Sequence, residues 1–230
     1  RMEPKKDKFF YYKYIGELTF LAGIVNICAI VLLELTITHY TGNLSKAAIA
    51  LADGEFTEFR EILSCILLFF LGSIVSGYIY HERKSDLTKY DTILPILFGI
   101  ILYTSFKTSD DSINILRVIS LGMGTQNGTY IRIKGILVRT THITGYLTDA
   151  GFCLGSLLRG NRDDAWKLMF YLGSILIFFF GGFISFLLIK FIGVKTLEVI
   201  AMLYCTFGLQ MGYHYLRERQ SKNPLNIETE

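Results

Sequence analysis

The sequence predicts an all-α polytopic membrane protein of about six transmembrane helices, arranged as a 3+3 inverted repeat with broken signature helices. Hydrophobic residues make up 51% of the chain and charged residues only 19%, below the roughly 25% that is typical of soluble domains. Residues 168–189 and 62–80 contain no charged side chain, and a helix needs about 20 mostly apolar residues to cross a bilayer. A soluble chain of 230 residues is too short to bury several helices of this kind.

Six apolar segments follow one another along the chain, and we expect each to be a transmembrane helix. They are residues 15–37, 62–80, 92–106, 118–131, 168–189 and 199–213. The first is long and has no A-x-A-like cleavage site after it, so we expect a retained helix rather than a signal peptide. Residues 1–14 form a basic N-terminal segment that we expect to be cytoplasmic, and residues 217–230 form a polar C-terminal tail.

Two short signatures divide the chain into related halves. The first, THYTGNL, covers residues 38–44, and the second, THITGYL, covers residues 141–147, at a constant offset of 103. We therefore expect one three-helix repeat over residues 15–110 and a second over residues 111–216. An odd number of spans per repeat inverts the second copy, as in many secondary transporters. Capping of a helix start is the simpler interpretation of the Thr and Asn residues of each signature, and both interpretations stay open.

The fourth apolar segment is short and polar. Its 14 residues, 118–131, include Gln126 and Asn127, and as a helix they rise about 21 Å, less than the hydrocarbon thickness. Polar backbone at that depth is tolerated only inside the protein or beside a cavity, so we expect a broken or cavity-lining helix. Close helix packing through the pair Gly124 and Gly128 is the alternative.

The distribution of basic residues indicates an orientation. With six spans, one side of the membrane holds 17 Lys and Arg residues and the other holds 6. Because cytoplasmic loops carry the excess of Lys and Arg, we expect both termini in the cytoplasm. The net charge of +3 is mild and forms no basic stripe, so no nucleic-acid partner is expected.

A combination of motifs resembles a known family. The motifs are G-x-x-N, R-T-T-x-x-T-G-x-L-T and T-G-N, which begin at Gly124, Arg139 and Thr41. Together they are similar to the YoaK-like bacterial membrane proteins, whose shared domain has no known function, and the resemblance spans roughly residues 15–213. It implies a small multi-pass protein of the bacterial inner (plasma) membrane, and it supplies no substrate, cofactor or catalytic residue.

Polar groups in and around the signatures are the candidate site residues. The candidates for solute binding are Asn26, Thr38, His39, Thr41, Gly42, Asn43, Gln126, Asn127, Arg139, Thr141, His142, Thr144, Gly145 and Thr148. Glu34 and Asp149 are candidates for ion coupling, because ionisable groups inside spans are costly. Interfacial pairing of Glu34, helix-start electrostatics at Asp149 and a positive-inside anchor at Arg139 are the simpler alternatives.

No metal, cofactor or catalytic residue is expected. The four histidines form no H-x-x-x-H or E-x-x-H pattern, and the four cysteines have no C-x-x-C spacing. The leading hypothesis is a small secondary transporter or permease for a small polar or anionic solute. A non-catalytic membrane binding or assembly subunit is the alternative, and a lipid-modifying membrane enzyme is a weaker one. The expected partners are the lipid bilayer, the solute and, as a further hypothesis, a second copy of the chain in a homodimer.

Overall fold

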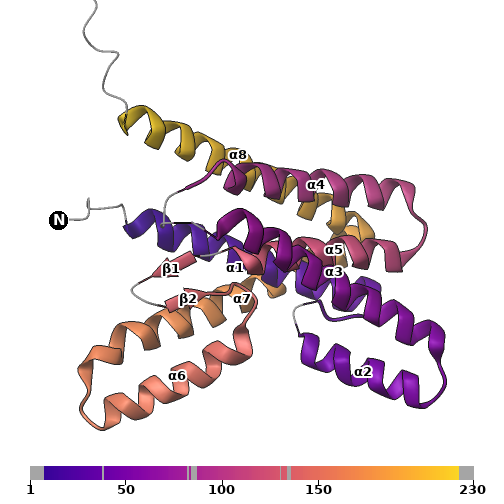
Figure 1. Ribbon diagram of the computed structural model, residues 1–230, viewed down its shortest axis with the longest axis horizontal. Helices are drawn as coiled ribbons and strands as arrows, with labels where there is room; N and C mark the ends of the chain where they lie inside the picture. The colour runs from indigo at the N-terminus through magenta and orange to yellow at the C-terminus, as the bar shows by residue number, and fades with distance from the viewer. Residues whose placement is uncertain are drawn as a thin grey trace, which may run out of the picture.

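Helices make up most of the chain (Figure 1). The structure, a computed structural model, describes residues 8–37, 39–81, 83, 87–129, 131–133 and 136–222, so Thr38 and the end of the predicted tail lie outside it. The first half contains α1 (Lys8–Leu33), α2 (Tyr40–Ala52), α3 (Phe56–Tyr80) and α4 (Tyr90–Thr108). The second half contains α5 (Ser112–Gly128), β1 (Ile131–Ile133), β2 (Ile136–Val138), α6 (Ile143–Leu158), α7 (Ala165–Ile192) and α8 (Thr196–Lys222). Short 3-10 turns at Arg162–Asp164 and Gly193–Lys195 precede α7 and α8.

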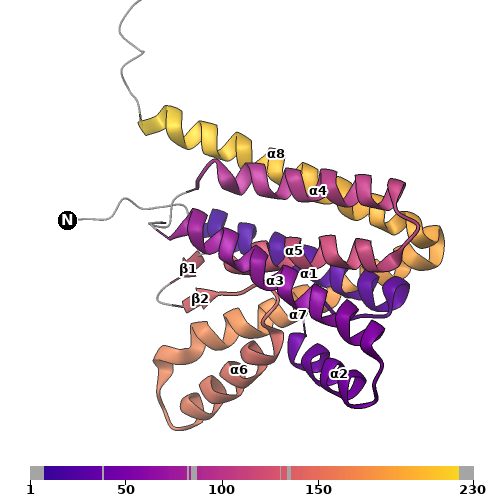
Figure 2. The ribbon, with the colours of Figure 1, turned by 45° about the vertical axis from the view of Figure 1, so that its right-hand side comes forward.

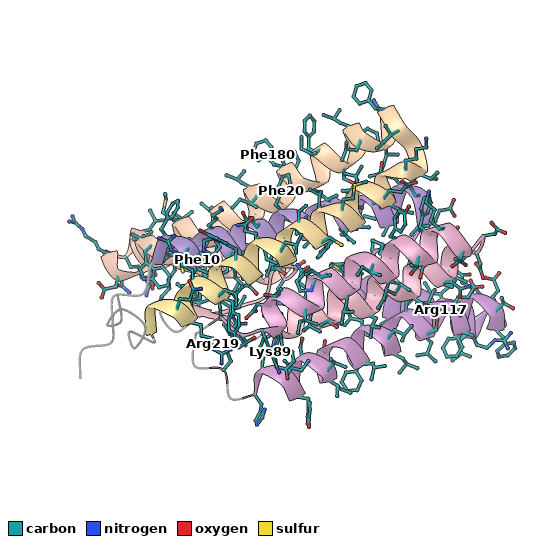
Figure 3. All side chains as sticks on the ribbon, turned by 90° about the horizontal axis from the view of Figure 1, so that it is seen from above. Phe10, Phe20, Lys89, Arg117, Phe180 and Arg219 are labelled. Carbon is teal, nitrogen blue, oxygen red and sulfur yellow. The ribbon has the colours of Figure 1, made fainter. Side chains whose placement is uncertain are left out.

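Several helices have the length and apolar character of membrane spans. Among the described residues, three helical stretches qualify: Phe9–Leu33, Phe56–Tyr80 and Arg162–Gln220, the last of which contains both α7 and α8. At 1.5 Å per residue, α1, α3 and α7 each exceed the roughly 30 Å of hydrocarbon. Large apolar side chains on α7, such as Phe180, are exposed (Figure 3), which suits contact with lipid. The chain is therefore a helical membrane protein.

The six predicted spans overlap α1, α3, α4, α5, α7 and α8, and the signatures occupy two further helices. Residues 40–44 and 143–147 open the short helices α2 and α6, which have 13 and 16 residues. The signatures therefore do not end the preceding spans. Each begins a separate helix that packs back against the next long one, α2 against α3 and α6 against α7.

The sequence predicts a broken or cavity-lining helix over residues 118–131. Helix α5 runs without interruption from Ser112 to Gly128, so the break is absent, but several residues of this segment do line a cavity. The prediction began the segment after Arg117 because that residue is charged, yet the structure includes Arg117 in the helix. Its guanidinium is satisfied there, since Nε donates to Ser64 Oγ at 2.9 Å and Nη1 donates to Asn114 Oδ1 at 2.9 Å.

The long helices pack in pairs through reciprocal glycine contacts. Where α1 crosses α7, a Cβ at Gly23 would clash with the carbonyl of Phe178, and one at Gly181 would clash with the carbonyl of Phe20. Where α5 crosses α3, Gly124 meets the carbonyl of Phe69 in the same way, and Gly72 meets that of Leu121. The α5 contacts lie 101 residues after those of α1, and the α7 contacts lie 109 residues after those of α3. The close-packing alternative for these glycines is thus what the structure contains.

The third pair, α4 with α8, also packs through two close contacts between a glycine and a carbonyl group. A Cβ at Gly99 would lie 2.6 Å from the carbonyl oxygen of Ala201, and one at Gly208 would lie 2.8 Å from that of Thr92. Both the two glycines and the two carbonyls are separated by 109 residues. The two contacts of this pair are therefore related by one sequence offset.

A small hairpin and a central core complete the fold. Strands β1 and β2 pair antiparallel with Ile131 opposite Val138 and Ile133 opposite Ile136. The core contains the fully buried side chains of Ile24, Ile119, Met123, Ile200 and Met211, which come from α1, α5 and α8. The hairpin leads the chain from the end of α5 back to the start of α6 (Figure 1).

Candidate functional site

Each signature places a histidine at the start of a short helix. His39 is the N-cap residue of α2 and His142 is that of α6, and neither side chain caps its helix with a hydrogen bond. Each ring instead packs over the glycine three residues later: a Cβ at Gly42 would lie 3.4 Å from His39 Nδ1, and one at Gly145 would clash with the ring of His142. The His-x-x-Gly spacing common to both signatures is therefore a packing relationship.

In each short helix, a residue of the first turn is hydrogen-bonded to the residue seven positions earlier in the chain. In α2 the Thr36 hydroxyl donates to Asn43 Oδ1 at 2.9 Å, and the Asn43 amide donates back to the Thr36 carbonyl. In α6 the backbone N–H of Arg139 donates to the Tyr146 hydroxyl at 2.9 Å. Asn43 and Tyr146, the inward-facing residues of the two first turns, are both buried.

The two short helices begin beside the middle of the long helices that follow them. The Tyr40 ring of α2 lies 4.1 Å, centroid to centroid, from Phe69 near the midpoint of α3. Ile143 of α6 lines a groove with Phe178 and Phe179 near the midpoint of α7. Figures 1 and 2 both show α2 and α6 starting side by side and running apart toward opposite ends of the molecule. The first amides of a helix have no intrahelical acceptor, so this junction collects two positive helix ends.

Several predicted site residues of the second copy form one buried network. Gln126 Nε2 donates to the Leu18 carbonyl at 3.0 Å and to Thr140 Oγ1 at 2.9 Å, and Gln126 Oε1 accepts from the Tyr204 hydroxyl at 2.7 Å. Gln126 thus joins α5 to α1, α8 and the segment before α6.

Asn127 extends this network to the second signature. Its amide donates to Thr141 Oγ1, and its Oδ1 accepts from the Thr141 N–H at 3.3 Å. Arg139 Nη1 donates to the Asn127 carbonyl. The structure therefore brings together Asn127, Arg139 and Thr141, which the sequence analysis proposed separately.

The remaining candidates lie apart from this network. Asn26 is buried within α1, whereas Thr41, Thr144 and Thr148 are exposed on the first turns of α2 and α6. Glu34 and Asp149 are also exposed, and Glu34 adopts a left-handed φ of 58° just after α1 ends. Their ion-coupling role stays a prediction. Within the described ranges, no three His, Cys, Asp or Glu side chains are grouped as a metal site would require.

The sequence analysis missed a buried charged cluster around Asp91. Both charged side chains are enclosed: Arg83 is 2% exposed and Asp91 is 1% exposed, with Arg83 Nη1 3.1 Å from Asp91 Oδ1. The hydroxyls of Tyr14 and Tyr80 donate to the same oxygen at 2.8 and 3.3 Å, and the N–H and hydroxyl of Thr88 donate to Asp91 Oδ2. Burial lowers the pKa of the Arg83 guanidinium, but Asp91 raises it, and the resulting pKa lies above the ordinary value for arginine.

A cavity of about 200 Å³ lies between this cluster and the Gln126 network. Tyr14, Tyr80 and Asp91 line one part of it, and Gln126 and Tyr204 line another. Most of the remaining wall is apolar, from α4 and α5. Asp91 directly precedes the uncharged run 92–106, so in the sequence it resembles an ordinary polar residue at the end of a span.

The chain matches the protein family described as Protein of unknown function (DUF1275) over residues 17–209. No curated protein and no solved structure gives a significant match. The matched residues run from the first half of α1 to the middle of α8, and they include both signatures, the glycine crossings and the Gln126 network. The chain therefore belongs to DUF1275, a family of unknown function.

Proposed function

We propose that this protein is a small secondary transporter or permease for a small polar or anionic solute. The observation that carries the proposal is the junction at which α2 and α6 begin side by side, against the midpoints of α3 and α7. Helix starts at membrane depth direct unpartnered amides toward a solute, and discontinuous helices of this kind form the binding sites of many transporters.

The proposal includes an inverted repeat. The paired close contacts of Gly23 and Gly181 where α1 crosses α7, and of Gly72 and Gly124 where α3 crosses α5, support it. In the proposed arrangement α1, α3 and α4 are the spans of one repeat, α5, α7 and α8 are those of the other, and α2 and α6 enter the bilayer from opposite sides. Two such halves can rock about a shared central site, which is the basis of alternating access.

The proposed orientation places both termini in the cytoplasm of a bacterial cell, with the chain in the inner membrane. Helix α1 starts and helix α8 ends at the same end of the molecule (Figure 1). Lys89 and Arg219 lie at that end with Phe10, and Arg117 lies toward the other (Figure 3). The positions of these basic residues support the proposed orientation under the positive-inside rule.

A flux assay in proteoliposomes tests the proposal. Purified protein is reconstituted, and uptake of labelled acetate, sulfate, phosphate and amino acids is measured with and without imposed ion gradients. We expect saturable uptake of at least one solute, and a large loss of it in Arg139→Gln, whose guanidinium donates to the Asn127 carbonyl in the last turn of α5. Lys46→Gln, a change at an exposed basic residue of α2, is the matched control and should retain uptake. Absence of uptake for every solute, together with absence of ligand-induced thermal stabilisation, would contradict the proposal.

A further inference from the structure

The cavity beside Asp91 is separate from the junction of α2 and α6. Its wall comes from α1, α3, α4, α5 and α8, and no residue of α2, α6 or α7 lines it. Its volume of about 200 Å³ exceeds the roughly 150 Å³ of an engineered apolar cavity that takes up benzene. It therefore has room for one small organic molecule.

Aromatic rings make up a large part of the cavity lining. Five of them line it: Tyr14, Tyr80, Phe98, Tyr204 and Phe207. Phe98 and Tyr204 pack edge to face, with centroids 4.6 Å apart, and Tyr14 lies 5.6 Å from Phe207. Ring faces carry negative potential and attract organic cations, particularly where water is excluded.

The tyrosine hydroxyls that line the cavity already donate hydrogen bonds to other side chains of the protein. Tyr14 and Tyr80 donate to Asp91, and Tyr204 donates to Gln126 Oε1 at 2.7 Å. Each phenolic oxygen keeps lone pairs that can accept a further hydrogen bond.

Other polar side chains of the lining also donate their hydrogen bonds to groups of the protein. Thr125 Oγ1 donates to the Leu121 carbonyl at 2.9 Å, and Thr129 Oγ1 donates to the Thr125 carbonyl at 3.3 Å. Both bonds described for Gln126 Nε2 also use its amide protons, toward Leu18 and Thr140. Among the described residues, the side chains of the lining therefore offer acceptors and π faces rather than donors.

The charged group in the described lining is a carboxylate. Asp91 lines the cavity, and no Lys or Arg of the described residues does. Arg83 lies 3.1 Å from Asp91 and 5.0 Å from the centre of the Tyr80 ring, so it offsets part of the carboxylate charge from outside the lining. The preference for a cation must therefore come from the rings and acceptors together with a partly neutralised carboxylate.

We infer that this cavity is a binding site for a small apolar organic cation, such as a quaternary ammonium compound. An anion would be repelled by the carboxylate and would find no side-chain donor among the described lining residues, and a neutral molecule would lack the cation–π attraction. The inference does not depend on transport, because binding at equilibrium is sufficient. A cation–π contribution of the usual size corresponds to about tenfold tighter binding of the cation than of a neutral molecule of the same shape.

Calorimetric titration of the full chain in nanodiscs tests the inference with three probes that share a benzyl group. Benzyltrimethylammonium is the cation, phenylmethanesulfonate is the anion, and benzyl methyl sulfone is a neutral compound that offers acceptors only. We expect the cation to bind at least about tenfold more tightly than the other two. Equal binding of the anion, or no measurable binding of the cation, would overturn the inference.

A matched pair of variants locates the bound probe. Leu94→Phe fills the cavity, because Leu94 lines it, whereas Ile93→Phe changes the neighbouring residue, which is 41% exposed and outside the lining. Binding should be lost in Leu94→Phe and kept in Ile93→Phe. If Leu94→Phe does not fold, Phe98→Leu is the variant that tests the site. It removes one aromatic ring from the lining and should weaken binding of the cation several-fold. Unchanged affinity in whichever variant folds would place the probe elsewhere and overturn the inference.

Discussion

Asn43 and Tyr146 lie 103 residues apart and perform the same task, since each joins the first turn of its short helix to the residue seven positions earlier. The two residues differ chemically and are one of only two mismatches between the signatures. The two helix starts therefore share a similar local geometry that different side chains produce.

Loss of the hydrogen bonds between Asn43 and Thr36 should destabilise the first turn of α2. In Asn43→Ala the half-buried Thr36 loses the partner of its hydroxyl and its carbonyl, and we expect a loss of about 1–2 kcal/mol in the free energy of unfolding. Hydrogen exchange at the first turn of α2 should become faster. Ser45→Ala is the control, because its exposed hydroxyl donates to the carbonyl of Thr41 within the same helix and its loss should change stability by less than about 0.5 kcal/mol. Equal exchange rates in the two variants would contradict a stabilising role for the hydrogen bonds between Thr36 and Asn43.

Two glycines of α3 should respond with opposite signs to the same substitution. Gly72→Ala places a methyl group against the Leu121 carbonyl and the Thr125 N–H, so it must separate α3 from α5 at a cost of about 1–3 kcal/mol. At Gly77 none of the described residues lies within 4 Å of the position that a Cβ would occupy, and Gly77→Ala should be neutral or stabilise the helix by up to about 1 kcal/mol. Thermal unfolding in detergent measures both. A Gly72→Ala protein as stable as Gly77→Ala would show that the crossing is looser than described.

Gln126 and Tyr204 should be energetically coupled. Tyr204→Phe and Gln126→Leu each leave a buried partner unpaired, and each should cost about 1–3 kcal/mol. The double variant should cost less than the sum of the two, with a coupling of about 0.5–3 kcal/mol. Strictly additive effects in a double-mutant cycle would contradict the hydrogen bond.

The two ion pairs of α4 should differ sharply in their effect on stability. Arg83→Gln leaves the Asp91 carboxylate buried without its cation and should cost about 3–5 kcal/mol, part of which Asp91→Asn should restore in the double variant. Lys107 and Glu198 form a pair at 2.8 Å whose side chains are 47% and 21% exposed, so Lys107→Gln should cost less than about 1 kcal/mol. Chemical denaturation of the three variants tests this ranking, and a larger effect of Lys107→Gln would reverse it.

The helical membrane class could be predicted from the sequence because long uncharged runs rarely occur in soluble proteins. Gly124 stands out in the sequence as one of a pair with Gly128, but sequence alone cannot distinguish a cavity-lining segment from a close helix crossing. That distinction depends on which helix lies opposite, and the structure places carbonyl groups there. Similarly, the predicted span 118–131 begins only after Arg117, because a hydropathy pattern does not reveal the partners of this residue, Ser64 and Asn114.

The candidate site was predicted in part. Gln126, Asn127, Arg139 and Thr141 stood out because they are polar and close to a signature, and local hydrogen bonds join most of them. The cluster of Tyr14, Tyr80, Arg83 and Asp91 did not stand out, because its members come from three helices and a connection that only tertiary packing brings together. Each of them alone resembles an ordinary residue at the edge of a span.

The depth of the two helix starts in the bilayer tests the account most directly. Spin labels are attached to Thr41→Cys and Thr144→Cys, both at exposed positions, in a background without Cys28, Cys65, Cys153 and Cys205. Accessibility to oxygen and to a polar relaxation agent gives each depth, and a dipolar measurement gives their separation. We predict that both labels lie near the midplane and are much closer together than the roughly 30 Å thickness of the hydrocarbon. Labels at opposite membrane surfaces, separated by about that thickness, would contradict the central solute site.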